Sequence, residues 1–238
     1  MQHLLVNSFP NSGTNMLLQI VRADWHIRRY ETDVGGIKRD IDAIREDLWE
    51  SFQPLTNKRR CVGHVPWNDT IYYLLEKMGI KTILLIRDPR DCVVAHMFHV
   101  KKFFASSAQN FRVSGQLLHT RPDPMMDIIC GLGERLAEIT PWISRANDYK
   151  DANILPLKYE SFRTVPLATC QEMIKFAPDV FRNESSTTLA QRIKPNESPT
   201  FRKGEIGDWK NHFKAKHIKT FWKDNGIVEA MRIMGYEK

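Results

Sequence analysis

The sequence predicts a three-layer α/β fold, in which a parallel sheet is flanked by helices on both faces. Four short apolar runs read as strands, and helical patterns occupy the segments between them. Strands that alternate with helices favour a parallel sheet, because each crossover helix packs back onto the sheet. In addition, polar residues follow each strand, at the edge where sheets of this kind bind their ligands.

The four predicted strands are HLLVNSF, RRCVGHV, KTILLIR and NILPLKYE, at residues 3–9, 59–65, 81–87 and 153–160. The predicted helices span residues 14–24, 70–78, 91–104, 125–146 and 166–176. Asp69 is expected to cap the second of these helices and Gly79 to stop it. From residue 195 the alternation gives way to a polar loop and then a helix-like tail over residues 216–237.

Composition limits the classes of function. The chain has 238 residues, 42% of them hydrophobic, which suits one domain over residues 1–238. The net charge of +7 favours anionic ligands, but acidic residues are interspersed with basic ones, so no nucleic-acid partner is expected. The four cysteines form no zinc pattern, and no metal is expected. No membrane span or signal peptide is visible, which predicts a cytoplasmic protein if Met1 is the native start.

The opening loop, SFPNSGTNM at residues 8–16, has the composition of a phosphate-binding turn. Gly13 allows the backbone to approach a ligand, and the N–H groups that begin the next helix point outward. Ser12 and Thr14 add hydroxyl donors. An ordinary strand-to-helix turn remains open as an alternative on this stretch alone. The signature G-x-x-x-x-G-K-[ST] is absent, which disfavours a P-loop kinase of small molecules.

Three further motifs follow in order. KTILLIRDPRDCVVAH has Arg87 after a strand, and LKYESF has Tyr159 and Glu160 after the fourth strand. FRKGEIGDWKNHF contains an Arg-Lys-Gly string followed by Gly-Asp-Trp-Lys. Together with SFPNSGTNM, these motifs resemble those of sulfotransferases that use 3′-phosphoadenosine 5′-phosphosulfate (PAPS), with the cytosolic and bacterial-type members most similar. The resemblance extends over residues 4–237.

The resemblance implies a fold of the P-loop-containing nucleotide-binding type, with PAPS as co-substrate, adenosine 3′,5′-bisphosphate (PAP) as product and no metal. The opening loop would hold the 5′-phosphosulfate, Arg87 and the Arg-Lys-Gly string would bind the 3′-phosphate, and Tyr159 would lie near the adenine. A fork-shaped guanidinium suits a terminal phosphate. The residues at which donor binding is implied are Asn11, Ser12, Gly13, Thr14, Asn15, Met16, Arg87, Tyr159, Arg202, Lys203 and Gly204.

His64 closes the second predicted strand on the ligand side, and the resemblance implies that it is the catalytic base. A neutral histidine suits this role because its unperturbed pKa is about 6.5. His96 and His99 follow Arg87 on a predicted helix and are the reserve candidates. In-line transfer of the sulfuryl group to an acceptor oxygen then makes the same demands as phosphoryl transfer.

The sequence departs from the family pattern near the reaction centre. Asn11 stands where cytosolic members carry a lysine that contacts the bridging oxygen of the donor. Met16 stands in place of a tryptophan that packs on adenine, Ala95 in place of a serine near the 3′-phosphate, and Val62 in place of a further basic residue. We expect Asn11 to donate a weaker, neutral hydrogen bond and the loop amides to do most of the leaving-group stabilisation.

Several alternatives remain open from the residues alone. Arg87 has Asp88 and Asp91 as salt-bridge partners within reach, the Arg202–Lys203 pair suits a solvated loop, and Tyr159 suits simple core packing. For the chain as a whole, the runner-up is a non-catalytic protein that binds PAP or PAPS.

The acceptor is a small molecule or a glycan, with phenols, other alcohols and amines all open. Its pocket is expected from residues 30–56 and 100–124, which mix aromatic and basic side chains, and the polar stretch 105–124 suits a lid. Whether the chain forms a homodimer stays open.

Overall fold

The computed structural model describes residues 3–22, 60–104, 121–194 and 202–236, together with short pieces of backbone between residues 25 and 50 and between 112 and 117. Five strands form one sheet in which every neighbouring pair is parallel. Their order is β2 (Trp25–His26), β5 (Arg60–Gly63), β1 (His3–Ser8), β6 (Ile80–Ile86) and β9 (Ile154–Lys158). Two short antiparallel pairs lie outside it, β3 (Tyr30–Glu31) with β4 (Ile37–Lys38) and β7 (Arg112–Val113) with β8 (Gln116–Leu117).

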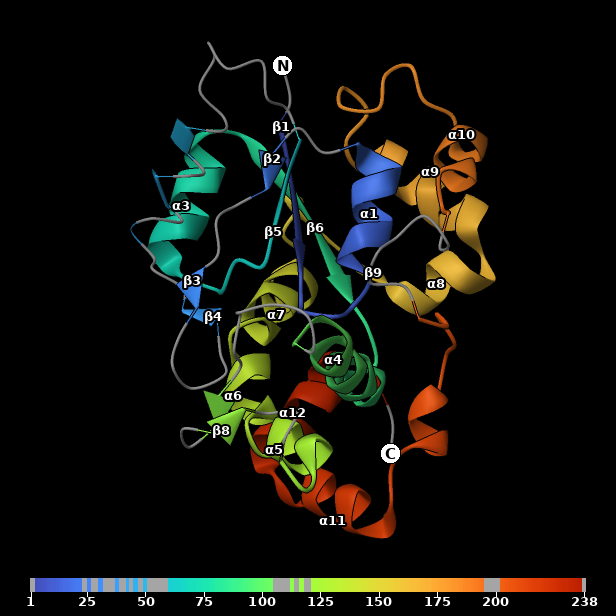
Figure 1. Ribbon diagram of the computed structural model, residues 1–238. Helices are drawn as coiled ribbons and strands as arrows, with labels where there is room; N and C mark the ends of the chain where they lie inside the picture. The colour runs from blue at the N-terminus through green and yellow to red at the C-terminus, as the bar shows by residue number, and fades with distance from the viewer. Residues whose placement is uncertain are drawn as a thin grey trace.

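The two faces of the sheet bury different side chains because residues alternate along each strand. Leu4 and Val6 of β1 pack in one cluster, and Leu5 packs in the other. The cluster with Leu4 and Val6 also contains residues of α1 (Thr14–Val21), α8 (Tyr159–Thr164), α9 (Pro166–Phe176) and α10 (Ser186–Gln191). The cluster with Leu5 contains residues of α3 (Asp69–Lys77) and α7 (Thr140–Asp148) on the opposite face. Helices therefore cover both faces, as Figure 1 shows, and the predicted three-layer α/β fold is confirmed.

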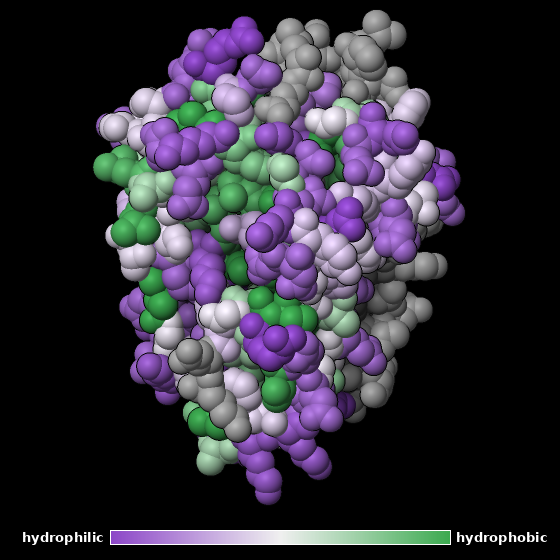
Figure 2. Space-filling view, turned by 180° about the vertical axis from the view of Figure 1, so that it is seen from behind, coloured by the Kyte–Doolittle hydropathy of each residue, from purple (hydrophilic) through white to green (hydrophobic). Residues whose placement is uncertain are grey.

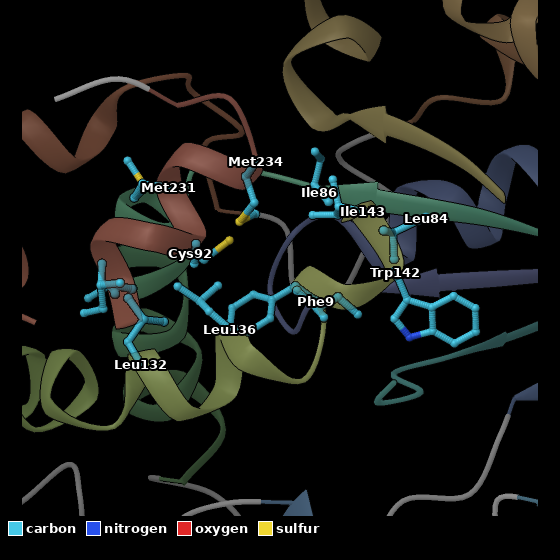
Figure 3. Close-up of a cluster of buried hydrophobic side chains, with 14 of the residues drawn as sticks. Phe9, Leu84, Ile86, Cys92, Leu132, Leu136, Trp142, Ile143, Met231 and Met234 are labelled. Atoms are coloured by element: carbon cyan, nitrogen blue, oxygen red, sulfur yellow. The ribbon is translucent and has the colours of Figure 1, made fainter. Parts of the chain in front are cut away.

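A second set of helices lies beyond the carboxyl ends of the strands, in the lower half of Figure 1. It consists of α4 (Pro89–Phe104), α5 (Pro124–Cys130), α6 (Leu132–Ala137), α11 (Ala215–Lys223) and α12 (Asn225–Ile233). Figure 3 shows Cys92, Leu136 and Met234 pointing into one cluster, with Phe9 from the opening loop and Ile86 from β6 beside them. The loop after β1 thus packs, through Phe9, against the hydrophobic cluster of these helices.

Four sequence predictions need correction. Residues 125–146 form parts of three helices, because Gly131 ends α5 and Pro141 can enter only the first turn of α7. Asn68 caps α3 in place of Asp69, since its side chain accepts the N–H groups of Thr70 and Ile71.

The tail and the fourth strand also differ in detail. The helix-like tail is two helices, because the Asp224 side chain caps α12 through the N–H of Ile227. The fourth strand ends at Lys158 and not at residue 160, because Tyr159 begins α8. The remaining predicted strands and helices appear with ends shifted by a few residues.

The surface is mixed. From behind, it is mostly hydrophilic, with hydrophobic residues gathered in the upper middle of the view (Figure 2). Among the described residues, no helix is both long and apolar enough to cross a membrane. Nor do the described residues contain a group of three or more His, Cys, Asp or Glu side chains that could hold a metal ion.

Candidate active site

The opening loop joins the end of β1 to α1 and is held by its own hydroxyl groups. Ser12 donates from Oγ to the Phe9 carbonyl at 2.5 Å, and Ser8 and Thr14 share a hydroxyl hydrogen bond of 2.8 Å. Ser8 and Ser12 are fully buried. The loop therefore keeps its shape through internal bonds, and it leads directly into the N-terminus of α1, where backbone N–H groups and the helix dipole favour an anion.

Gly13 is required for a second reason besides closeness to a ligand. Its φ of 109° lies in the region that favours glycine, and a Cβ there would lie 2.7 Å from Cδ2 of Tyr159. The ring of Tyr159 therefore packs directly under the loop. A larger residue at this position would displace the ring.

His64 follows β5 immediately and reaches across to the end of β1. Its Nδ1 is 2.5 Å from the carbonyl oxygen of Ser8 and 3.2 Å from Ser8 Oγ, and the residue is 8% exposed. A carbonyl oxygen only accepts, so Nδ1 carries the hydrogen and the lone pair of neutral His64 lies on Nε2. This tautomer suits a general base.

The same edge of the sheet is tied together by Asn7. Its side chain exchanges two hydrogen bonds of 2.8 Å with the backbone of Val65, the residue after His64. Asn7 and Ser8 were not predicted as site residues. Their place at the end of the first strand, one strand away from His64, was the available signal.

Arg87 lies between the opening loop and the segment that follows residue 201. Its guanidinium donates to the Asn11 carbonyl at 3.3 Å and the Glu205 carbonyl at 3.2 Å, and it lies 4.4 Å from the centre of the Tyr159 ring. Its Nε is buried and has no hydrogen-bond partner among the described residues. Arg87 is thus held by neutral groups.

The two acids offered as partners of Arg87 hold other groups. Asp88 accepts three side-chain hydrogen bonds from Arg90, the shortest 2.7 Å. Asp91 accepts the backbone N–H groups of Gly207 and Trp209 at 2.7 and 2.9 Å. Asp91 therefore docks the later segment against the start of α4, which the sequence reasoning did not foresee.

The Arg-Lys-Gly string lies in this same corner. The Tyr159 hydroxyl donates to the Gly204 carbonyl at 3.2 Å. Arg202 pairs with Asp208 and stacks over Phe98 at 4.4 Å, and Lys203 lies 3.9 Å from Asp208. Although burial alone would raise it, the hydrogen bond from Arg202 lowers the pKa of Asp208 to about 2. Arg87, Arg202 and Lys203 are thus brought together with the rings of Tyr159 and Phe98, and Asp208 pairs with two of the three cations.

The side chain of Asn11 contacts α4, whereas its carbonyl accepts from Arg87. Its φ of 65° is left-handed, a region that asparagine tolerates, and its Nδ2 is 2.9 Å from Nδ1 of His96. Burial first, and then the nearby Arg135 and His99, lower the pKa of His96 to about 3, so this histidine stays neutral. Asn11, His96 and Arg135 line one cavity of about 10 Å³, room for about one water molecule.

Three other predicted residues, Asn15, Met16 and His99, lie on α1 and α4. Asn15 is half-buried in the first turn of α1, and Met16 packs against the hydrophobic cluster of that face. His99 lies half-buried on α4, three residues beyond His96. Most of residues 30–56 and 105–120, where the acceptor pocket and lid were expected, lie outside the described residues.

Comparison with known proteins identifies the family to which this chain belongs. The sulfotransferase domain matches residues 1–235, and the chain belongs to this family. Sulfotransferase 1 family member D1 of Mus musculus is 22% identical over 93% of this chain and 81% of its own length. Sulfotransferase 2A6 of Mus musculus is 25% identical over 92% of this chain and 81% of its own length. The predicted family and the predicted class of enzyme, a sulfotransferase, are confirmed.

Solved structures share the fold. Mouse sulfotransferase SULT7A1 complexed with PAP superposes with a TM-score of 0.65 at 19% identity, covering 97% of this chain and 84% of that one. Retinol dehydratase in complex with retinol and PAP gives a TM-score of 0.62 at 17% identity, covering 97% and 81%. The predicted P-loop-type α/β fold is therefore confirmed.

Proposed function

We propose that this chain transfers the sulfuryl group of PAPS to a hydroxyl or amine group of an acceptor, with His64 as general base. The observation that carries the proposal is the hydrogen bond from His64 Nδ1 to the Ser8 carbonyl, 2.5 Å long. It leaves the basic lone pair on Nε2 in a histidine that follows a strand at the ligand edge of the sheet.

The donor is held from two sides in this proposal. The loop of Asn11, Ser12, Gly13, Thr14 and Asn15 binds the 5′-phosphosulfate, chiefly through backbone N–H groups at the start of α1. Arg87, Arg202, Lys203 and the backbone of Gly204 bind the 3′-phosphate. The 4.4 Å stacking of Arg87 on Tyr159 and the bond from Tyr159 to Gly204 support one shared pocket for these groups.

The proposed reaction is a single in-line displacement. The acceptor hydroxyl gives its proton to His64 Nε2 as its oxygen forms a new bond to sulfur. The bond between sulfur and the bridging oxygen breaks, and its electron pair leaves on the 5′-phosphate of PAP. Positioned general bases of this kind contribute about 10²–10⁴ in rate. No metal is part of this proposal.

The acceptor is proposed only by class. Retinol occurs with PAP in one structural neighbour and androsterone with PAP in another, and both are alcohols. A small-molecule alcohol or phenol is therefore the first acceptor to test, and amines and glycans follow. A single domain over residues 1–238, a cytoplasmic location and a homodimer remain predictions.

Thermal unfolding with different ligands, followed by a transfer assay, tests the proposal. PAP at 100 times its Kd is expected to raise the Tm by about 5–10 °C, whereas ATP and DNA raise it little. Labelled sulfate should then pass from PAPS to an acceptor in a panel of phenols, alcohols, amines and glycans. Equal stabilisation by ATP would contradict a 3′-phosphate site. Stabilisation by PAP without transfer to any acceptor would favour a non-catalytic binder.

A further inference from the structure

Residues 235–236, which follow α12, fold back onto the start of α8. The Lys158 ammonium donates to the Gly235 carbonyl at 2.8 Å and lies 4.4 Å from the centre of the Tyr236 ring. The Tyr236 hydroxyl donates to Oε2 of Glu160 at 2.7 Å. Two side chains from around the end of β9 therefore fasten this segment.

Glu160 connects that segment to the turn behind Arg87. Its second oxygen, Oε1, accepts the backbone N–H of Asp88 at 3.1 Å. Asp88 is the residue after Arg87, and Tyr159, the residue before Glu160, carries the Arg87 guanidinium on its ring. The carboxylate thus lies between the Tyr236 hydroxyl and the backbone that sets the direction of Arg87.

The side chain of Asp88, in the turn after Arg87, is held by a separate set of contacts. The side chain of Asp88 is occupied by Arg90, which stacks over Trp209 at 4.3 Å. The Asp88 N–H, in contrast, is held by Glu160 alone among the contacts of the described residues. Loss of the Tyr236 hydroxyl would free Oε2 of Glu160 and allow the carboxylate to turn away from that N–H.

We propose that Tyr236 is a positioning residue for the 3′-phosphate of the donor, acting through Glu160 on the turn that carries Arg87. The inference rests on the proposed function, because it concerns the affinity for a nucleotide with a 3′-phosphate. Burial and the negative charge of Glu160 raise the pKa of the Tyr236 hydroxyl above its ordinary value, so it remains a donor throughout the working pH range.

Calorimetric titration with PAP and with adenosine 5′-monophosphate, which lacks only the 3′-phosphate, tests the inference. Tyr236→Phe is expected to weaken PAP binding about three- to tenfold, the effect of one net hydrogen bond, and to leave binding of the monophosphate unchanged. Tyr149→Phe is the matched control, because Tyr149 is 70% exposed and its ring lies 5.1 Å from the Arg145 guanidinium, away from the residues of the proposed site. It should alter neither titration.

Glu160→Gln gives an independent measurement of the same link. Glu160→Gln should reduce the affinity for PAP relative to the monophosphate to a similar extent. The double variant of Tyr236 and Glu160 should bind PAP no more weakly than either single variant, because both substitutions break the same chain of hydrogen bonds. Additive losses would overturn the inference. If Tyr236→Phe failed to fold, as circular dichroism would reveal, Glu160→Gln would carry the test.

The outcomes separate the two proposals. A wild-type chain that binds PAP no better than the monophosphate contradicts the proposed function itself. A wild-type chain that prefers PAP, together with a folded Tyr236→Phe variant of unchanged preference, contradicts only the role of Tyr236. Equal weakening of both nucleotides would indicate a merely structural contribution and would also overturn the inference.

Discussion

The two halves of the proposed donor site differ in charge. The loop half, residues 9–16, contains no charged side chain, and its polar side chains bond largely to the protein itself. The cation half consists of Arg87, Arg202 and Lys203, and it is organised by Asp91 and Asp208. Neutral amides bind any anion of suitable shape. A separate cluster of cations, in contrast, favours a nucleotide with a 3′-phosphate over one that lacks it. We infer that the loop half serves the reaction and the cation half selects the donor.

Substitution of His64, which borders the loop half, is expected to have the largest effect and tests whether this half serves the reaction. His64→Ala should lower kcat by about 10²–10⁴ and leave the Kd of PAP nearly unchanged, because the base acts on the acceptor. Turnover and calorimetric binding measure the two quantities. His99→Ala provides the comparison variant on α4. Unchanged turnover in His64→Ala would remove the base assignment.

Arg87 tests the cation half. Arg87→Ala should weaken PAP binding about tenfold to a hundredfold, as expected for charge-assisted hydrogen bonds, with little change for adenosine 5′-monophosphate. Arg87→Lys should restore part of the loss, since it returns the charge without the fork. Equal weakening of both nucleotides would show that Arg87 holds the loop through Asn11 and does not read the 3′-phosphate.

Local sequence signals predicted most of the fold but few of the cross-chain links. The short apolar runs at β1 and β6 identified the sheet, and the turn around Gly13 and the strand-end histidine identified the candidate site. The bond between Asn11 and His96 joins residues 85 positions apart, and that between Glu160 and Tyr236 joins residues 76 apart. Such pairs depend on how helices pack on the sheet, which no local periodicity encodes. The break at Gly131, in contrast, has a local signal, because glycine is common where a helix ends.

A third prediction concerns the pH dependence of stability in the cation half. Because Arg202 holds the pKa of Asp208 near 2, below its unfolded value of about 3.9, the carboxylate stabilises the fold above pH 4 and loses this effect as pH falls toward 2. Asp208→Asn should therefore lower the free energy of unfolding at pH 7 by about 1–2 kcal/mol. Urea unfolding at pH 7 and pH 3 measures it. A difference between wild type and variant that did not shrink at pH 3 would contradict the charge-based account.

The smallest expected effect lies at Asn11, where the loop half lacks a cation. Asn11→Ala combines loss of the side chain with an unfavourable left-handed backbone, so Asn11→Gly is the cleaner variant at a φ of 65°. Asn11→Gly should lower kcat about two- to tenfold, the effect of one neutral hydrogen bond, with PAP affinity little changed. Steady-state turnover with saturating PAPS measures it. If turnover were unchanged, leaving-group stabilisation would have to come from elsewhere, and Arg135, which lines the same cavity as Asn11 and His96, would be the first cation to substitute.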